Sequence, residues 1–210
     1  MTSQFGEDSR LWQVLSGVGH GRYIDVGAGH PVDGSISYSF YQKGWRGVTV
    51  EPVLELADLH AIFRPDDYNF AVAITDSGDD RLALYTFPGT GLSTAVEANF
   101  LRHRGRFENH EVRRVPAAPL SKVLADAGWL PSDDVHFMSV DVEGLEAQVF
   151  GSFPLEEWMP WYLVVEATLP GTMTPSLDFE PAVLAAGYRP CLYEAVNRFY
   201  SAPGRPQITA

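Results

Sequence analysis

The feature that most constrains this chain is a strand that runs into a two-glycine turn, followed by a helical segment and a second strand that ends on an acid. The first strand, 23–26, leads into Gly27-Ala28-Gly29, a helix is expected over 36–43, and the second strand, 48–50, ends on Glu51-Pro52. Because glycine has no Cβ, the turn permits positive φ and lets the backbone approach a ligand closely. An acid about twenty residues beyond the turn can accept hydrogen bonds from a ribose diol. This order is typical of a βαβ unit that binds a nucleoside cofactor.

The details of the turn favour one class of cofactor. A dinucleotide would need a third small residue at position 32, where this chain has Val32 after Pro31. An acid at the end of the first strand, Asp25, together with free backbone N–H groups, suits a cofactor with an amino-acid tail. S-adenosylmethionine (SAM) has that tail. We therefore expect SAM, and a strand-turn-helix without any ligand is the alternative.

Length and composition predict one α/β domain over residues 1–210, with a helical segment in 1–20 and a frayed tail from 203 to 210. The chain has 210 residues, and 45% of them are hydrophobic, which is enough for a proper core. No secretory signal or membrane-length apolar run is visible, so we expect a cytoplasmic protein without a membrane partner. The single cysteine, Cys191, excludes an internal disulfide.

The charge of the chain bears on its partners. A net charge of −12 argues against binding a nucleic-acid backbone and suits a cationic sulfonium cofactor. The segment 102–114 runs against this trend, with five Arg and two Glu. It is either a solvated face or a loop that meets an anionic substrate or carrier. We expect a small-molecule acceptor as partner, and a homodimer is compatible with the sequence.

The middle of the chain predicts further βα units. A helix over Leu54–Phe63 precedes a third strand, 69–74, and a polar loop with Asp76 and Ser77. Because ligands bind over the carboxyl ends of parallel strands, these two residues are candidates for the adenine edge, although Asp-Ser-Gly is also ordinary turn chemistry. We expect strands over 81–87 and 112–115 and a helix over 120–127. Ser93 or Thr94 is expected to cap another helix, which runs to residue 101.

Acids follow two neighbouring strands of the predicted sheet. The strand 136–140 is followed by Asp141 and Glu143, and the strand 161–165 by Glu166. Three carboxylates could thus converge beside the cofactor and bind Mg²⁺ through oxygen ligands. Alternatively, one of them could act as a general base, with its pKa raised by its like-charged neighbours. The sequence leaves both roles open, and it also leaves a histidine base open, at His30, or at 103 or 110.

The end of the chain completes the pattern with a helix over 179–186 and two strands, 188–193 and 196–201, which form a hairpin. The motifs are, in order, Ser3-Gln4-Phe5-Gly6-Glu7-Asp8, Tyr23-Ile24-Asp25-Val26-Gly27-Ala28-Gly29-His30-Pro31, Gly44-Trp45-Arg46-Gly47-Val48-Thr49-Val50-Glu51-Pro52, Leu92-Ser93-Thr94, Asp141-Val142-Glu143-Gly144-Leu145-Glu146, Val165-Glu166 and Asn197-Arg198-Phe199-Tyr200. Over nearly its full length, the chain resembles the FkbM family of SAM-dependent methyltransferases.

The resemblance implies a class I methyltransferase fold. This is a Rossmann-like three-layer α/β sandwich, with a mostly parallel seven-stranded sheet and an antiparallel C-terminal hairpin. The chain is short, and we expect no large inserted lid. The resemblance also implies O-methylation of a hydroxyl on a sugar or natural product, with SAM as methyl donor.

The resemblance assigns roles to individual residues. It implies that Asp25 and the turn Gly27-Ala28-Gly29 hold the methionine part of SAM. Glu51, next to Pro52, would hold the ribose, and Ser77 with its neighbour Asp76 the adenine. Three acids would line the reaction centre, namely Asp141, which also faces the cofactor, Glu143 and Glu166. Some related macrolide-sugar methyltransferases use Mg²⁺ held by acids at these strand ends, which makes Asp141 and Glu166 candidate metal ligands.

The expected mechanism is in-line transfer from the sulfonium to a substrate oxygen, with Asp141 as first candidate for base or metal ligand and Glu166 as second. Two other functions are compatible with the scaffold. One is a nicotinamide-dependent oxidoreductase, which Val32 and the lack of a Tyr-x-x-x-Lys pair disfavour. The other is a SAM-binding protein that does not catalyse, which the clustered acids disfavour because buried carboxylates are costly.

Overall fold

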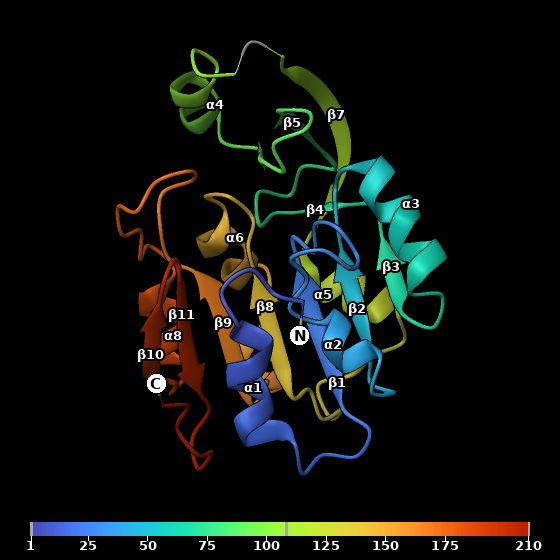
Figure 1. The fold of residues 1–210 in the computed structure, drawn as a ribbon, viewed down its shortest axis with the longest axis vertical. Coiled ribbons are helices and arrows are strands. Elements are labelled where there is room, and N and C mark those ends of the chain that lie inside the picture. Colours follow the sequence, from blue (N-terminus) through green and yellow to red (C-terminus); the bar gives the residue numbers. More distant parts are fainter. Residues whose placement is uncertain (1, 108, 210) are drawn as a thin grey trace.

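Short apolar strands form the centre of the protein. The structure is a computed structural model and describes residues 2–107 and 109–209. Figure 1 shows a twisted sheet whose strands, in spatial order, are β10 (Arg189–Glu194), β11 (Asn197–Ser201), β9 (Tyr162–Glu166), β8 (Phe137–Val140), β1 (Arg22–Val26), β2 (Arg46–Val50) and β3 (Tyr68–Phe70). Neighbours run parallel except at β11, which is antiparallel to both β9 and β10. The expected seven-stranded sheet with an antiparallel C-terminal hairpin is confirmed.

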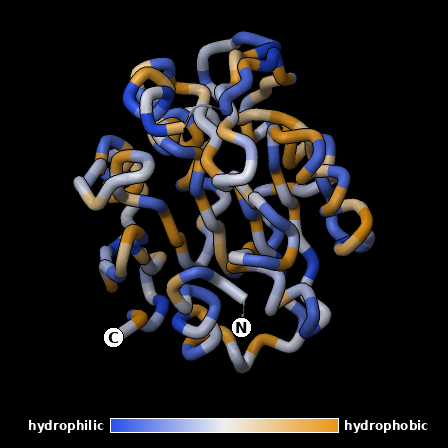
Figure 2. Tube along the Cα trace, turned by 45° about the horizontal axis from the view of Figure 1, so that its top comes forward, coloured by the Kyte–Doolittle hydropathy of each residue, from blue (hydrophilic) through white to orange (hydrophobic). Residues whose placement is uncertain are grey.

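Both faces of this sheet are buried, which explains why its strands are apolar almost throughout. One face, with Ile24, Met138 and Leu163, packs against α5 (Leu120–Asp126), α6 (Glu146–Gly151) and α8 (Glu180–Ala185). The other face, with Tyr23 and Phe137, packs against α1 (Glu7–Leu15) and α2 (Tyr38–Tyr41). Hydrophobic segments accordingly run through the middle of the molecule in Figure 2. The three-layer arrangement is as expected.

A second, smaller sheet lies beyond the carboxyl ends of the main strands, at the top of Figure 1. Its strands are β4 (Ala73–Ile74), β7 (Glu111–Ala118), β5 (Arg81–Thr86) and β6 (Ser93–Thr94), and α4 (Glu97–His103) accompanies them. We call residues 73–118 the cap; Glu108 lies outside the described residues. The expectation of no large inserted lid was wrong, because the alternating pattern of 81–87 does not indicate which sheet a strand joins.

Several expected boundaries also change. The predicted strand 69–74 divides into β3 and β4, because β2 ends at Val50 and Ala73 pairs instead with Ala117 of the cap. The predicted helix over 36–43 shortens to α2. The helix α3 (Leu54–Phe63) has the predicted bounds, and α7 (Leu155–Trp158) was not predicted.

The two ends of the chain pack against the body. The helix α1 lies within the segment 1–20 that was expected to be helical, and its Leu11 and Leu15 are fully buried. The tail was expected to fray from 203, but Ile208 is buried in the core and Tyr162 Oη donates to the carbonyl of Pro206 at 3.0 Å. Within the described residues, no helix combines the length and apolar character needed to cross a membrane.

Candidate active site

A cavity of about 670 Å³ opens between the carboxyl ends of the main strands and the cap. This volume lies in the range of small-molecule sites, and the position is where open α/β sheets bind ligands. The main sheet contributes the turn 27–29, Glu51 and the acids at the carboxyl ends of β8 and β9. The cap contributes apolar side chains, among them Leu84, Phe87 and Leu92.

The glycine turn is shaped by its neighbour strand. Gly27 has φ 76°, and a Cβ there would lie 1.7 Å from the carbonyl oxygen of Asp141. The backbone N–H groups of Gly27 and Ala28 donate to the carbonyl of Val50 at 2.9 and 3.1 Å. Position 27 therefore requires glycine so that β1, β2 and β8 can end side by side, which brings the turn and Asp141 together at the floor of the cavity.

Glu51 fastens the same turn. Its two carboxylate oxygens accept from Gly29 N–H at 2.9 Å and Val53 N–H at 2.8 Å, and burial raises its pKa to about 7. His60, on α3, contacts the carbonyl of Gly29 through Nε2 at 3.0 Å. Burial, together with the nearby Arg64, lowers the pKa of His60 to about 4, so the ring is neutral and Nε2–H donates. His60 was not predicted, because it belongs to no local sequence motif.

Asp25 lies beneath the turn rather than in the cavity. It is 4% exposed and accepts a hydrogen bond from Ser37 Oγ. Burial raises its pKa, whereas Arg64 opposes the rise. The structure thus does not bring Asp25 to the cavity lining, where a contact with the methionine part of SAM was expected.

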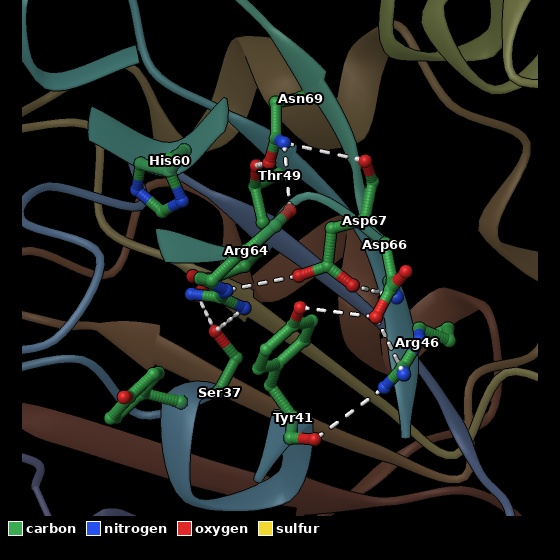
Figure 3. A network of polar contacts seen from close by, with 12 residues as sticks. Ser37, Tyr41, Arg46, Thr49, His60, Arg64, Asp66, Asp67 and Asn69 are labelled. Carbon is green, nitrogen blue, oxygen red and sulfur yellow. Dashed lines mark hydrogen bonds and ion pairs between the residues drawn. The ribbon is translucent and has the colours of Figure 1, made fainter. Parts of the chain in front are cut away.

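A buried cation holds this region together. Arg64 follows α3, and its guanidinium donates to Asp67 at 2.9 Å and to Ser37 at 2.7 Å (Figure 3). It also donates to Tyr23 Oη at 2.8 Å. Tyr23 Oη in turn donates to Asp67 at 2.6 Å. Arg64 has no exposed surface. Through Ser37, it links the helix α2 and the region after α3 to Asp25 below the cofactor turn.

The three acids singled out at the strand ends come together in the cavity. Asp141, Glu143 and Glu166 each offer a carboxylate oxygen, and these atoms lie within 4.8 Å of one another. Glu166 is 8% exposed, and its Oε1 accepts from Thr168 Oγ1 at 3.3 Å. Among the described residues, no hydrogen-bond partner reaches Glu143 Oε2 or Glu166 Oε2. We call these three residues the carboxylate cluster.

The pKa values of all three carboxyl groups in the cluster are raised. Burial, followed by the charges of Asp141 and Glu143, raises the pKa of Glu166 far above its usual range. The pKa of Glu143 is raised by burial and by the charge of Asp141. The pKa of Asp141 is raised by desolvation in the cavity, and the neighbouring Glu166 carboxyl group opposes this rise. Nearby, Glu146 accepts from the N–H groups of Val142 and Gly144, and burial raises its pKa to about 7. At neutral pH, the cluster therefore retains protons.

Other predicted residues lie elsewhere. Asp76 lines a separate surface hollow beside Gly151, and Ser77 is exposed and bonds Thr75 and Asp79, so neither lines the cavity. Near Glu51, the lining is instead apolar, with Val53, Leu56, Val72 and Ala73.

The candidate histidines do not join the carboxylate cluster. His30 lines the cavity, but its Nδ1 accepts from the N–H groups of Val32 and Asp33. His103 is buried and contacts the carbonyl of Pro170 at 2.8 Å. His110 packs against aromatic rings of the cap.

The terminal motifs close the cavity on the side of β11. Glu7 Oε1 accepts from Asn197 Nδ2 at 2.6 Å, and both residues line the cavity. Asn197 lies opposite Glu166 in the register of β11 with β9. In the Arg-rich segment, Arg113 also lines the cavity, where it pairs with Glu55 at 2.5 Å and Glu111 at 2.7 Å.

Sequence comparison identifies the family. The sequence model of the family described as "Methyltransferase FkbM domain" matches residues 25–190. This range includes the glycine turn, Glu51 and the whole carboxylate cluster. The chain belongs to the FkbM methyltransferase family. The sheet of this FkbM domain, with β11 inserted antiparallel between β9 and β10, is the class I methyltransferase sheet. The FkbM domain therefore has the fold and family membership of a SAM-dependent methyltransferase.

Comparison with solved structures gives a remote match. The FkbM domain is similar to a structure titled as a TehB-like SAM-dependent methyltransferase from Corynebacterium glutamicum ATCC 13032 Kitasato, with 10% sequence identity and a TM-score of 0.47. The match covers 95% of this chain and 89% of that chain. No curated protein matches the sequence.

Proposed function

We propose that this enzyme O-methylates a hydroxyl of a small-molecule acceptor, such as a sugar or another natural product. The observation that carries the proposal is the carboxylate cluster, which lies in the same cavity as the glycine turn. SAM, when bound, supplies a methyl group on a cationic sulfonium, an already activated donor. The protein therefore has to align the acceptor oxygen with the methyl group and accept the hydroxyl proton.

The turn and Glu51 form the proposed cofactor site. Backbone groups of 27–29 face the cavity, and each Glu51 oxygen keeps a further lone pair for a ribose hydroxyl beyond the bond it already accepts. The apolar side chains of Val53, Val72 and Ala73 support an adenine slot beside Glu51, in place of Asp76 and Ser77. The acidic lining favours a cationic cofactor over an anionic one.

Asp141 is the proposed proton acceptor. Within the cluster, the pKa of Glu166 is raised furthest, so Glu166 keeps its proton at neutral pH. Burial raises the pKa of Asp141 less, to about 6, because the neighbouring Glu166 carboxyl group opposes the rise. Asp141 directly follows β8, and its own backbone carbonyl lies against Gly27 of the turn. With Glu166 protonated and Asp141 charged, Asp141 is the carboxylate that can accept the one proton released when the hydroxyl is methylated.

The cluster also fits a divalent cation. Three carboxylate oxygens within 4.8 Å, two of them on side chains with an unpartnered oxygen, match the oxygen ligands that Mg²⁺ prefers. Asp141, Glu143 and Glu166 would hold the ion, which would lower the pKa of an acceptor hydroxyl bound to it.

The test is methyl transfer from labelled SAM to pairs of glycosides and polyketides that differ only in one hydroxyl, with Mg²⁺ or EDTA. We expect transfer only to the hydroxylated member of a pair. Asp141→Asn should lower turnover by about 10²–10⁴-fold and leave SAM affinity nearly unchanged. Asp76→Asn is the matched control, because it removes the same charge outside the cavity. Full turnover in Asp141→Asn, or labelling of the deoxy members, would contradict the proposal.

A further inference from the structure

The cap reaches the carboxylate cluster at the backbone of Glu143. The carbonyl oxygen of Glu143 accepts hydrogen bonds from Thr94 Oγ1 at 2.8 Å and from Asn99 Nδ2 at 3.0 Å. Thr94 ends β6 and Asn99 lies in the first turns of α4, so both donors belong to the cap. Thr94 is 1% exposed and Asn99 5%, and water therefore does not compete for either bond.

The backbone that these bonds hold is unusual. Glu143 has φ 54°, in the left-handed region that residues with a Cβ rarely adopt, and Gly144 follows with φ 108°. A Cβ at Gly144 would lie 2.6 Å from Asn99 Nδ2, so the cap and this turn fit closely. A strained conformation of this kind persists only where its surroundings enforce it. It is also the conformation in which the Glu143 side chain meets Asp141 and Glu166.

Ser93 or Thr94 was expected to cap the helix that follows, and the structure gives a different reason for the Leu92-Ser93-Thr94 motif. The helix α4 begins only at Glu97 and has no side-chain cap. The hydroxyl of Thr94 accepts from Val96 N–H at 3.1 Å and donates across to Glu143. The local turn therefore orients the hydroxyl toward the cluster.

We propose that Thr94 and Asn99 are positioning residues, whose hydrogen bonds from the cap hold Glu143 in its left-handed conformation and so complete the carboxylate cluster. The chemical role of the cluster rests on the proposed function, whereas the positioning role of Thr94 and Asn99 concerns only the backbone conformation of Glu143. It makes assembly of the site depend on the cap, although neither residue belongs to the cluster itself.

The chain offers a matched control in Thr90. Its hydroxyl accepts from Leu92 N–H at 3.1 Å and donates to the carbonyl of Phe87 at 2.7 Å, so it forms the same local turn entirely within the cap. Thr90→Val therefore removes a cap hydroxyl of the same kind without touching Glu143. Thr94→Ser keeps the donor and tests for rescue.

The experiment compares wild type, Thr94→Val, Thr94→Ser, Thr90→Val and the double variant Thr94→Val/Asn99→Leu. Backbone ¹³C chemical shifts of Glu143 report whether its φ is positive, and calorimetry gives the SAM affinity. Mn²⁺ titration of EDTA-treated protein, followed by electron paramagnetic resonance, reports on the cluster.

We expect Glu143 to leave the left-handed region in Thr94→Val and in the double variant, and to keep it in Thr94→Ser and Thr90→Val. In the variants whose Glu143 chemical shifts change, Mn²⁺ affinity should fall about tenfold or more, as it does when other residues that orient metal ligands are removed. SAM affinity should stay within about twofold of wild type. Left-handed Glu143 shifts in the double variant would overturn the inference. If wild type binds no Mn²⁺ but the shift change occurs, the metal part of the proposed function fails and the positioning role stands.

Discussion

Arg64 is the buried cation on which the polar network beneath the cofactor turn depends, and its removal gives the sharpest stability prediction. Methionine has a similar length and no charge. In Arg64→Met, Asp67 loses a cation at 2.9 Å and Ser37 loses a donor (Figure 3). Tyr23 loses a donor as well. Asp25, also buried, loses the charge that opposes the rise of its pKa. Two carboxylates then remain in the protein interior without a cation.

The expected size of the effect follows from this burial. Removing one partner of a buried ion pair costs about 3–5 kcal/mol. For a domain of this size, one kcal/mol lowers Tm by about 2–4 °C, so Tm should fall by roughly 10 °C. Without Arg64, the pKa values of Asp25 and Asp67 rise further. The loss should therefore be largest at pH 7 to 8 and shrink toward pH 5, where these carboxyl groups take up protons.

The assay is thermal and urea unfolding at pH 5 and pH 7.5, with Arg46→Met as the control. Arg46 pairs with Asp66 at the same distance, 2.9 Å, but the two side chains are 42% and 58% exposed. An exposed pair contributes about 1 kcal/mol or less. If Arg64→Met and Arg46→Met lowered Tm equally, or if the loss in Arg64→Met did not depend on pH, the argument for a buried charge network would fail.

Two further predictions concern buried groups at or near the floor of the cavity. The folded-state pKa values of Glu51 and Glu146 are both about 7, above the ordinary value, so these groups stabilise the fold at low pH and that stability is lost as pH rises through 7. Together, deprotonation of Glu51 and Glu146 should lower the free energy of unfolding by roughly 1–2 kcal/mol between pH 6.5 and 8. His60, whose pKa is lowered to about 4, raises that free energy with pH mainly below this range. A flat or rising free energy of unfolding in urea between pH 6.5 and 8 would contradict this. Gly27→Ala should abolish SAM binding and lower Tm, because its Cβ would lie 1.7 Å from the Asp141 carbonyl, and calorimetry showing wild-type affinity would refute it.

The central sheet could be predicted from the sequence because its signals are local. The strands of the main sheet are buried on both faces and therefore read as apolar runs between turns. The helix Leu54–Phe63 was predicted with its observed bounds. The order of strands and acids was enough to predict that Asp141, Glu143 and Glu166 come together, because parallel strands end at one edge of a sheet.

What the sequence did not reveal depends on contacts between distant residues. Arg64 and Asp25 are joined through Ser37, and Thr94 reaches Glu143 from 49 residues away. No periodicity or spacing indicates such pairs. The cap was missed for the same reason, since β5 and β7 read as ordinary strands and only their long-range pairing separates them from the main sheet.

The most direct test of this account is calorimetric titration of SAM into the EDTA-treated protein and into Glu51→Ala. Glu51 holds the glycine turn through its bond to Gly29 N–H and lines the cavity. We therefore predict saturable binding of one SAM per chain to wild type, and loss of that binding in a folded Glu51→Ala protein. Absence of binding to wild type, or equal binding to both proteins, would contradict the claim that this cavity is the SAM site.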